Sequence, residues 1–384
     1  MAAASAAAPP PGPVIFISAG EPSGDLHGAA LVRALRRRFP HARFLGLGGA
    51  RMAAEGVELL AGLDELAVMG FVEVARHLPF FLRLRKRVFQ ALEHERVSLV
   101  VPIDYPGFNL RLARHARRCG VPVLYYIAPQ VWAWHASRAR HLAEDADAVA
   151  VILPFEAEFL RRAGARAEFV GHPLLDVPPP HGAHAEWAAR HGLDPRRPVL
   201  ALFPGSRRQE IARHLQLFAE AAARVTAVAP AVQPVIGASP DLPAEVYTGV
   251  RWPRVPSTDG LLHHATAALV KSGTSTLEAA LAGTPLVVAY RMNPWSYRLA
   301  KRLVKVPHIA LANLVADKRV APELVQEAAT PEALRDALLP LLDAGSPQRA
   351  AMLRELRQIR ETLGGGGAAD RVAELAAALL ARRS

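Results

Sequence analysis

Residues 269–291, LVKSGTSTLEAALAGTPLVVAYR, carry the strongest chemical signal in the chain. They read as an apolar strand, a turn at Gly273 and Thr274, a helix that bears Glu278, and a second apolar strand. A strand that ends at glycine and opens a helix directs free backbone N–H groups beyond the sheet, which suits a diphosphate. Glu278 lies one turn further along, where its carboxylate could accept hydrogen bonds from ribose hydroxyls. Taken alone, an ordinary strand–helix–strand unit with capping threonines explains the segment equally well.

A differently built glycine loop, SAGEPSGDLHG, occupies residues 18–28 and also connects a strand to a helix. Gly20 permits a tight turn there, and Ser23 or Asp25 could cap the helix. The spacing is not G-x-G-x-x-G, so a dinucleotide cofactor is not indicated. Glu21 stands at the loop tip, where it either faces a ligand or is a solvated turn carboxylate.

Two further strand ends carry polar side chains. Asp104 and Asn109 flank the turn in PIDYPGFN, which follows a strand predicted over 99–103. A carboxylate at the carboxyl end of such a strand is placed as catalytic bases are, although an Asx turn would use the same residue. In LFPGSRRQEI, Ser206 turns the chain, and Arg207 or Arg208 could clamp a phosphate.

An aromatic segment, YYIAPQVWAWH at 125–135, follows another strand. Trp132 and Trp134 could stack on a sugar, line an acyl groove or pack in a core. The histidines show no zinc-like spacing, and the D-x-D triplet within 144–147 reads as the lead-in to a buried strand, so we predict no metal site. There is no G-x-S-x-G elbow and no Walker loop.

The chain has 384 residues, 51% of them hydrophobic and 21% charged, and two globular domains are expected. Its formal net charge of +11 favours an anionic partner such as a phosphorylated metabolite, a nucleic acid or an anionic membrane surface. The single cysteine, Cys119, excludes an internal disulfide and fits a reducing compartment. No uninterrupted apolar segment reaches the roughly 20 residues of a spanning helix, so a soluble or peripheral protein is expected.

Short apolar strands alternate with amphipathic helices in two blocks, which predicts an α/β protein with two Rossmann-like domains and parallel sheets. We expect a disordered Ala/Pro leader at 1–12, a first domain at 13–175, a proline-rich linker at 176–184 and a second domain at 185–345. Residues 346–384 read as helices, the last of which could cross back onto the first domain. Because ligands bind beyond the carboxyl ends of parallel strands, both domains are expected to direct their loops into a central cleft.

Residues 70–92, GFVEVARHLPFFLRLRKRVFQAL, combine bulky apolar side chains with a cluster of basic ones. Such a segment suits a membrane surface, with Phe80 and Phe81 entering the interface and Arg83 and Arg85 meeting anionic head groups. A surface helix with one core-facing side is the competing interpretation.

Together these segments resemble the motifs of the lipid-A-disaccharide synthase family. They occur in the same order as in that family and extend from Ile15 to about Gln326. The resemblance implies a GT-B glycosyltransferase that joins UDP-2,3-diacylglucosamine to 2,3-diacylglucosamine 1-phosphate (lipid X). The products are the β-1,6 disaccharide 1-phosphate and UDP. The transfer inverts the anomeric carbon of the donor sugar. The matching blocks are SAGEPSGDLHG, GLGGARM, ELAVMGFVEV, IDYPGFN, YYIAPQVWAW, LPFE, FVGHPLLD, FPGSRRQEI, SGTSTLEAALAGTP, VVAYR and NLVADKRVAPELVQ.

The resemblance also assigns roles to residues. The family's loop glutamate corresponds to Glu21 and its strand-end aspartate to Asp104, of which Asp104 is the preferred general base. Arg207 corresponds to the PGSR arginine, Glu278 to the ribose-binding glutamate of the wider fold, and Asn313 to the asparagine of the N-L block. The further substrate-binding candidates are Gly20, Ser23, Asn109, Ser206, Gly273 and Thr274.

The same resemblance implies lipopolysaccharide biosynthesis in a Gram-negative bacterium. The enzyme would be cytoplasmic and peripheral on the inner face of the inner membrane, with no cofactor and no nucleic-acid partner. Gly107 stands where some relatives carry a second carboxylate, which leaves Asp104 as the sole acidic candidate in its block.

Two other function classes remain open. A GT-B-fold UDP-sugar epimerase would use the same nucleotide site but has no need of the basic segment at 71–92. A non-catalytic nucleic-acid binder would fit the net charge, yet no nucleic-acid motif is visible. The preferred acyl chain length and the choice between a monomer and a homodimer are not determined.

Overall fold

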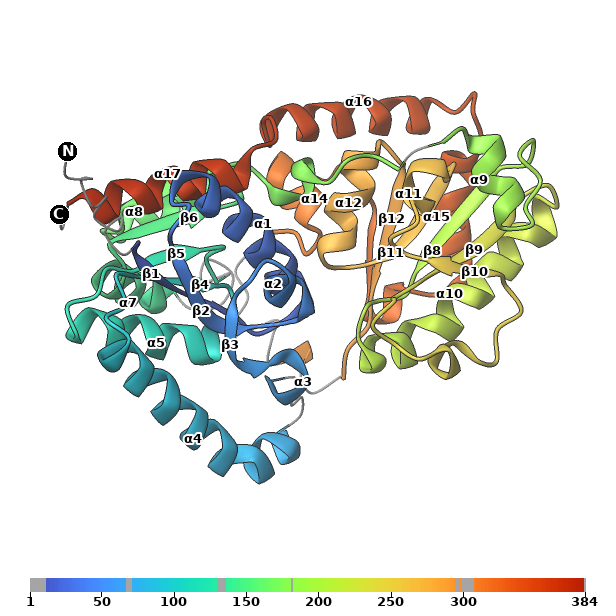
Figure 1. The fold of residues 1–384 in the computed structure, drawn as a ribbon. Helices are drawn as coiled ribbons and strands as arrows, with labels where there is room; N and C mark the ends of the chain where they lie inside the picture. Colours follow the sequence, from blue (N-terminus) through green and yellow to red (C-terminus); the bar gives the residue numbers. More distant parts are fainter. Residues whose placement is uncertain are drawn as a thin grey trace, which may run out of the picture. The chain divides into compact units, whose positions relative to one another are not determined.

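The computed structural model describes residues 12–66, 71–129, 136–180, 182–293, 297–298 and 307–382. The chain divides into two compact units, of which the first comprises Met1–Asp176 with Gly366–Ser384 and the second Val177–Gly365. Each unit contains one parallel sheet with helices packed against it (Figure 1). The prediction of two Rossmann-like α/β domains is therefore confirmed.

The sheet of the first unit has the strand order β3-β2-β1-β4-β5-β6-β7. The order reverses between β1 and β4, which are paired in register with Ala19 opposite Ile103. A reversal leaves space beyond the strand ends, because the two following loops turn to opposite faces of the sheet. We call this place the switch point of the unit. The strands are β1 Val14–Ala19, β2 Arg43–Gly48, β3 Glu58–Gly62, β4 Leu99–Ile103, β5 Leu124–Tyr126, β6 Ala148–Val151 and β7 Ala167–Phe169.

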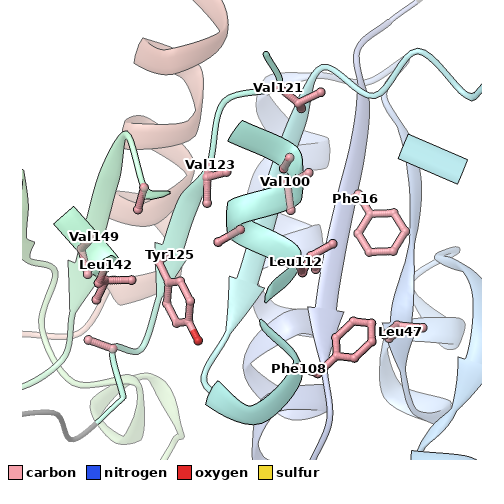
Figure 2. Packing of buried hydrophobic residues seen from close by; sticks show 14 of the residues in the cluster. Phe16, Leu47, Val100, Phe108, Leu112, Val121, Val123, Tyr125, Leu142 and Val149 are labelled. Atoms are coloured by element: carbon pink, nitrogen blue, oxygen red, sulfur yellow. The ribbon is translucent and has the colours of Figure 1, made fainter. Parts of the chain in front are cut away.

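Strand side chains alternate between two apolar layers, one on each face of this sheet. Phe16, Val100 and Tyr125 belong to one layer, together with residues of α5 and α7 (Figure 2). Residues of α4 and α8 belong to the same layer. Ile15 and Ile17 belong to the other layer, together with residues of α1 and α17. The helices of the unit are α1 Pro22–Arg38, α2 Ala50–Ala54, α3 Leu63–Leu66, α4 Phe71–His94, α5 Pro106–Arg118, α7 Ala136–Asp145, α8 Pro154–Arg162, the 3-10 turn η1 Pro173–Asp176 and α17 Ala368–Ala381.

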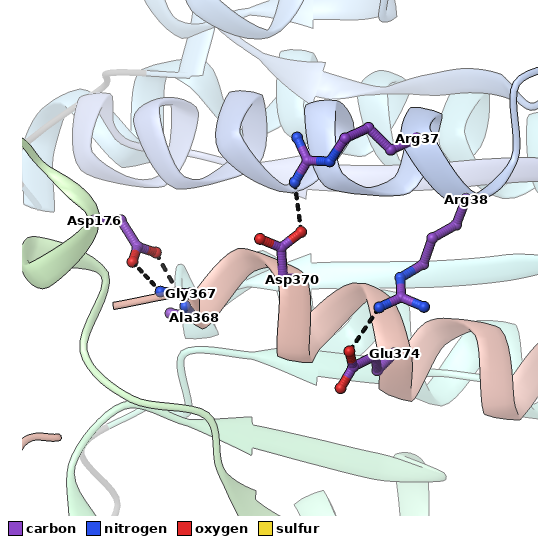
Figure 3. A network of polar contacts seen from close by, with 7 residues as sticks. All are labelled: Arg37, Arg38, Asp176, Gly367, Ala368, Asp370 and Glu374. Carbon is purple, nitrogen blue, oxygen red and sulfur yellow. Dashed lines mark hydrogen bonds and ion pairs between the residues drawn. The ribbon is translucent and has the colours of Figure 1, made fainter. Parts of the chain in front are cut away.

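The last helix, α17, is an integral part of the first unit. Val372 and Ala376 are fully buried beside residues of α1. The Asp176 carboxylate accepts hydrogen bonds from the N–H groups of Gly367 and Ala368 and so caps the helix. Exposed ion pairs, Arg37–Asp370 at 2.5 Å and Arg38–Glu374 at 2.6 Å, join α17 to α1 (Figure 3).

The second unit repeats the same plan. Its strand order is β10-β9-β8-β11-β12-β13, so its switch point lies between β8 and β11, where Phe203 is opposite Val270. The strands are β8 Val199–Phe203, β9 Gln233–Ala238, β10 Arg254–Pro256, β11 Ala267–Lys271, β12 Leu286–Tyr290 and β13 Glu323–Val325. The helices are α9 His184–Arg190, α10 Arg208–Val228, α11 Leu261–His264, α12 Thr274–Ala282, α14 Leu311–Ala316, α15 Pro331–Leu342 and α16 Pro347–Thr362, with 3-10 turns η2 Ala244–Tyr247 and η3 Gln326–Ala328.

The structure corrects the expected domain limits at two places. The residues predicted as one C-terminal helical block, 346–384, are divided, because α16 buries Met352, Leu356 and Ile359 and contacts α12, α14 and α15 of the second unit. The expected linker at 176–184 starts one residue early, since Asp176 closes η1 and caps α17 within the first unit. The predicted leader falls almost wholly outside the described residues.

The packing of the basic helix α4 differs from what the membrane prediction requires of its apolar side chains. Leu84, Val88 and Leu92 are buried at four-residue spacing, and Phe80 and Phe81 are partly buried against the same core layer. The helical period turns both phenylalanines toward the protein core, so the outward face offers other side chains for the predicted lipid contact. The outward face carries Leu82, which is 45% exposed, and the exposed side chains of Arg83, Arg85, Lys86 and Arg87. Among the described residues, no helix has both the length and the apolar character needed to span a membrane.

Candidate active site

The switch point of the first unit holds a strained backbone. Asp104 and Tyr105, which follow β4, have consecutive positive φ values of 45° and 49°, a region that residues other than glycine rarely adopt. The Asp104 carbonyl accepts hydrogen bonds from Asn109 Nδ2 and from the Tyr125 hydroxyl, both at 2.8 Å. The Asp104 N–H donates to the Tyr126 carbonyl at 3.1 Å. These bonds hold the aspartate at the strand end in one geometry.

Asn109 braces this corner from within. Its side chain is fully buried, its Nδ2 also donates to the carbonyls of Ser18 and Ile103, and its Oδ1 accepts a bond of 2.6 Å from the Ser18 hydroxyl. The amide therefore ties the end of β1 to the end of β4. The expected direct contact of Asn109 with substrate does not fit this burial, because its amide is used in hydrogen bonds to the backbone around Asp104.

Gly20 also has a packing role. A Cβ atom on Gly20 would lie 2.3 Å from the ring of Tyr105, so only glycine lets the ring cover this turn. Burial and the charge of Glu21 raise the pKa of Tyr105, and burial and the charge of Asp104 raise the pKa of Tyr125. The switch point thus gathers the Glu21 and Asp104 carboxylates around two neutral phenols.

The helix that follows Glu21 begins earlier than expected. It starts at Pro22, where a proline at the first turn is favoured, and no side chain caps it. Ser23 is exposed on that first turn. Asp25, expected as a cap for this helix, instead accepts hydrogen bonds from the N–H groups of Gly49 and Met52 at 2.7 and 3.0 Å. It therefore caps α2, which sequence spacing alone did not indicate.

The switch point of the second unit is organised by an ion pair. Lys271, the last residue of β11, lies 2.8 Å from Glu210 on α10, and the two side chains are only 16% and 17% exposed. The other carboxylate oxygen of Glu210 accepts the Ser206 N–H at 3.0 Å. Burial raises the pKa of Glu210, but the charge and hydrogen bond of Lys271, together with the Ser206 N–H, outweigh it and lower the pKa.

The ion pair shapes the loop that carries the predicted phosphate ligands. Gly205 has a φ of 134°, and a Cβ atom there would lie 2.5 Å from Glu210 Cβ. Ser206 and Arg207 are exposed just before α10, with Arg207 as its N-cap residue. Sequence reasoning missed Lys271 and Glu210, although a lysine that ends an apolar strand was a visible signal.

The predicted diphosphate helix has the expected form. α12 begins at Thr274 with Gly273 as its N-cap residue, and no side chain caps it. Glu278 follows on this helix, partly buried, and burial raises the pKa of its carboxyl group. None of the described residues forms a hydrogen bond or ion pair with the Glu278 carboxylate. A partly buried carboxylate without a protein partner is costly unless a ligand supplies one.

Asn313 does not fit the predicted ligand contact. It is fully buried, its Oδ1 accepts the N–H groups of Val320 and Ala321, and its Nδ2 donates to Glu323 at 2.8 Å. The asparagine thus fixes the connection between α14 and β13.

The aromatic candidates for stacking on a sugar, Trp132 and Trp134, lie outside the described residues.

The sequence resembles known proteins over nearly its whole length. A family model described as lipid-A-disaccharide synthetase matches residues 15–364. A curated lipid-A-disaccharide synthase from Acidobacterium capsulatum is 42% identical over 97% of this chain and 98% of its own length. That of Myxococcus xanthus is 42% identical over 96% of this chain and 98% of its own length. The chain belongs to the lipid-A-disaccharide synthase family. It is a glycosyltransferase.

Solved structures add the fold. A calicheamicin glycosyltransferase matches with a TM-score of 0.61 and 20% identity, over 97% of this chain and 99% of that one. The UDP-GlcNAc 2-epimerase of Neisseria meningitidis, bound to UDP-GlcNAc, matches with a TM-score of 0.58 and 10% identity, over 96% of this chain and 99% of that one. The lipid-A-disaccharide synthase family thus shares its GT-B fold with epimerases, and only sequence relatives separate the two classes.

We expect the ion pair at the second switch point to stabilise its unit only as a pair. Lys271→Met leaves Glu210 with an uncompensated charge in a mostly buried place and should lower the free energy of unfolding by about 3 kcal/mol. The double variant Lys271→Met, Glu210→Gln should recover part of that loss. Urea denaturation measures both. As a control, Arg224→Met removes an exposed ion pair with Glu332 in the same unit and should change little.

Proposed function

We propose that the protein transfers 2,3-diacylglucosamine from UDP to the 6-hydroxyl of 2,3-diacylglucosamine 1-phosphate. The products are the β-1,6-linked disaccharide 1-phosphate and UDP. The observation that carries the proposal is that each switch point holds one half of the required chemistry. The switch point of the first unit carries carboxylates. The switch point of the second unit carries a helix N-terminus with a neighbouring arginine. Family membership supplies the substrate class.

The second unit would bind the UDP part of the donor. The N-terminus of α12 at Gly273 and Thr274 offers N–H groups and a positive helix end to the diphosphate. Arg207 and Ser206 approach from the neighbouring loop, where a guanidinium can neutralise the departing phosphates. The Glu278 carboxylate would accept hydrogen bonds from the ribose hydroxyls, which would supply the partners that none of the described residues provides.

The first unit would supply the base. Attack by the 6-hydroxyl on the anomeric carbon forms the new C–O bond as the bond to the diphosphate breaks, and the hydroxyl proton passes to a carboxylate. Asp104 is our preferred acceptor of that proton because its backbone is held by Asn109 and Tyr125. Glu21 would orient the acceptor sugar from the adjoining loop. A single displacement inverts the anomeric carbon.

One assay tests this reaction against its main rival. The protein is incubated with the UDP-linked donor and lipid X, and products are followed by mass spectrometry. Formation of the disaccharide 1-phosphate with release of one UDP per product supports transfer. Epimerised UDP-sugar without UDP release would instead support the epimerase class, which has the same fold.

Asp104→Asn should lower turnover by about 10²–10⁴-fold, the usual contribution of a general base, while UDP affinity is unchanged. Asparagine tolerates the left-handed backbone, so this variant keeps the local fold. Asp317→Asn is the matched control, since Asp317 has a similar φ of 50° in the second unit. Steady-state kinetics and UDP calorimetry measure the effects. Near-normal turnover of Asp104→Asn would transfer the role of base to Glu21.

Glu278→Gln should weaken UDP binding by about 1–3 kcal/mol, the range for a hydrogen bond to a charged group. It should also stabilise the free protein at neutral pH. Because the folded pKa is raised, the Glu278 carboxyl destabilises the fold as pH rises from the unfolded to the folded value. The stability gain of the variant should therefore disappear below that window.

Calorimetry and denaturation at several pH values check these two effects. Glu245→Gln, an exposed change in the same unit, is the control. Unchanged UDP affinity in Glu278→Gln would contradict the ribose assignment, provided that the parent protein binds UDP.

We propose that the outward face of α4 docks on the inner leaflet of the cytoplasmic membrane, where both acylated substrates reside. Leu82 would enter the interface, and Arg83, Arg85 and Arg87 would meet anionic head groups at about 1 kcal/mol each. Changing these four residues to Gln should release the protein from vesicles that contain phosphatidylglycerol. Co-sedimentation at low and high salt measures this, because the attraction is screened by salt.

A variant with Arg118, Arg354 and Arg357 changed to Gln removes the same charge from other helices. It should bind vesicles like the parent protein. Equal release of both variants would mean that net charge alone, and not this face of α4, drives binding.

A further inference from the structure

A cluster of side chains that the proposed transfer does not use lies near the amino-terminal ends of the first unit's strands. The ends of α4 and α5, which lead into β4 and β5, lie side by side and each presents two side chains one turn apart. Phe89 and Glu93 come from α4, and His115 and Cys119 come from α5 and the residue that ends it. Asp104 follows the opposite, carboxyl end of β4.

Two of the three distances between the polar atoms match those around a tetrahedral metal. His115 Nε2 lies 3.5 Å from Glu93 Oε1 and 3.5 Å from Cys119 Sγ. All three ligand atoms lie within 4.8 Å of one another. Tetrahedral zinc with bonds of about 2.0–2.3 Å needs ligand atoms that are roughly 3.3–3.7 Å apart. Two of the three separations therefore have the required length before any metal arrives.

The imidazole is held in place by its neighbour. The His115 ring stacks on Phe89, with centroids 3.7 Å apart and planes inclined by 4°. This contact limits rotation of the ring and directs Nε2 toward both other ligands. Glu93 and Cys119 also line an open depression of about 1240 Å³, which gives solvent and ions access to the cluster.

We propose that Glu93, His115 and Cys119 form a binding site for a divalent metal of the zinc class, with water as the fourth ligand. This departs from the prediction of no metal site, which rested on histidine spacing in the sequence and not on these three side chains together. One carboxylate and one thiolate would balance the charge of the ion, and neutral imidazole suits the same class of metal. Binding replaces the S–H bond of Cys119 by a sulfur–metal bond and releases one proton to solvent.

The metal would act on structure and not on the transfer reaction. It would link the carboxyl end of α4 to that of α5, and so fix the loops that enter β4 and β5. Because α4 bears the proposed membrane-docking face, the link would also set the position of that face. The site does not rest on the proposed transfer reaction, since none of its residues belongs to either switch point.

Cobalt titration of the metal-free, reduced protein tests the proposal. We expect one Co²⁺ per chain, visible d–d bands of tetrahedral intensity and a thiolate-to-cobalt charge-transfer band. Cys119 is the only cysteine of the chain, so that band reports on this residue alone. Addition of Zn²⁺ should abolish the bands, release protons and raise the unfolding temperature of the parent protein.

Single variants separate a built site from adventitious binding. Cys119→Ser should lose the charge-transfer band, and Glu93→Gln and His115→Asn should each weaken Co²⁺ binding by about tenfold or more. His141→Asn, an exposed histidine on α7, should bind like the parent protein. Absence of the charge-transfer band in the parent, or equal Co²⁺ affinity in the parent and all three ligand variants, would overturn the proposal.

Discussion

The organisation of both units follows from one constraint on parallel sheets. Successive parallel strands need crossover connections, and where the strand order reverses the loops after two adjacent strands leave on opposite faces. Backbone and side chains at those two strand ends remain uncovered by helices. In this chain, one such place brings Glu21 beside Asp104, since Ala19 is paired with Ile103. The other brings the loop after Phe203 beside the start of α12.

Topology brings the strand-end loops close together, and buried side chains then hold these loops in one conformation. In the first unit, the buried amide of Asn109 joins two strand ends and supports the left-handed backbone of Asp104. In the second, the Glu210–Lys271 pair holds the loop that presents Arg207. Both devices are mostly buried and hydrogen-bonded on several sides, so they are rigid. Such preorganised supports would hold the proposed ligand-binding groups in position at little further entropic cost on binding.

The GT-B fold itself does not choose the reaction. A glycosyltransferase and an epimerase share it with this chain at 20% and 10% identity. What assigns this chain to the lipid-A-disaccharide synthase family is its sequence relatives, which are 42% identical over nearly the whole chain. The Glu93–His115–Cys119 cluster lies away from these sites, near the amino-terminal ends of the first unit's strands.

The sequence by itself determined the two α/β units and the strand-end loops with Glu21, Asp104, Arg207 and Glu278, because apolar periodicity and glycine turns are local signals. The family followed from the resemblance of its ordered motif blocks. It could not show that Asn109 is buried as a brace. Polar residues in a loop look alike in sequence whether they face a ligand or the protein interior. The tertiary structure also decided the core-facing position of the α4 phenylalanines, the division of the C-terminal helices between units, and the Glu210–Lys271 pair. Each depends on which segments, distant along the chain, become neighbours when the sheets assemble, and that information is not local.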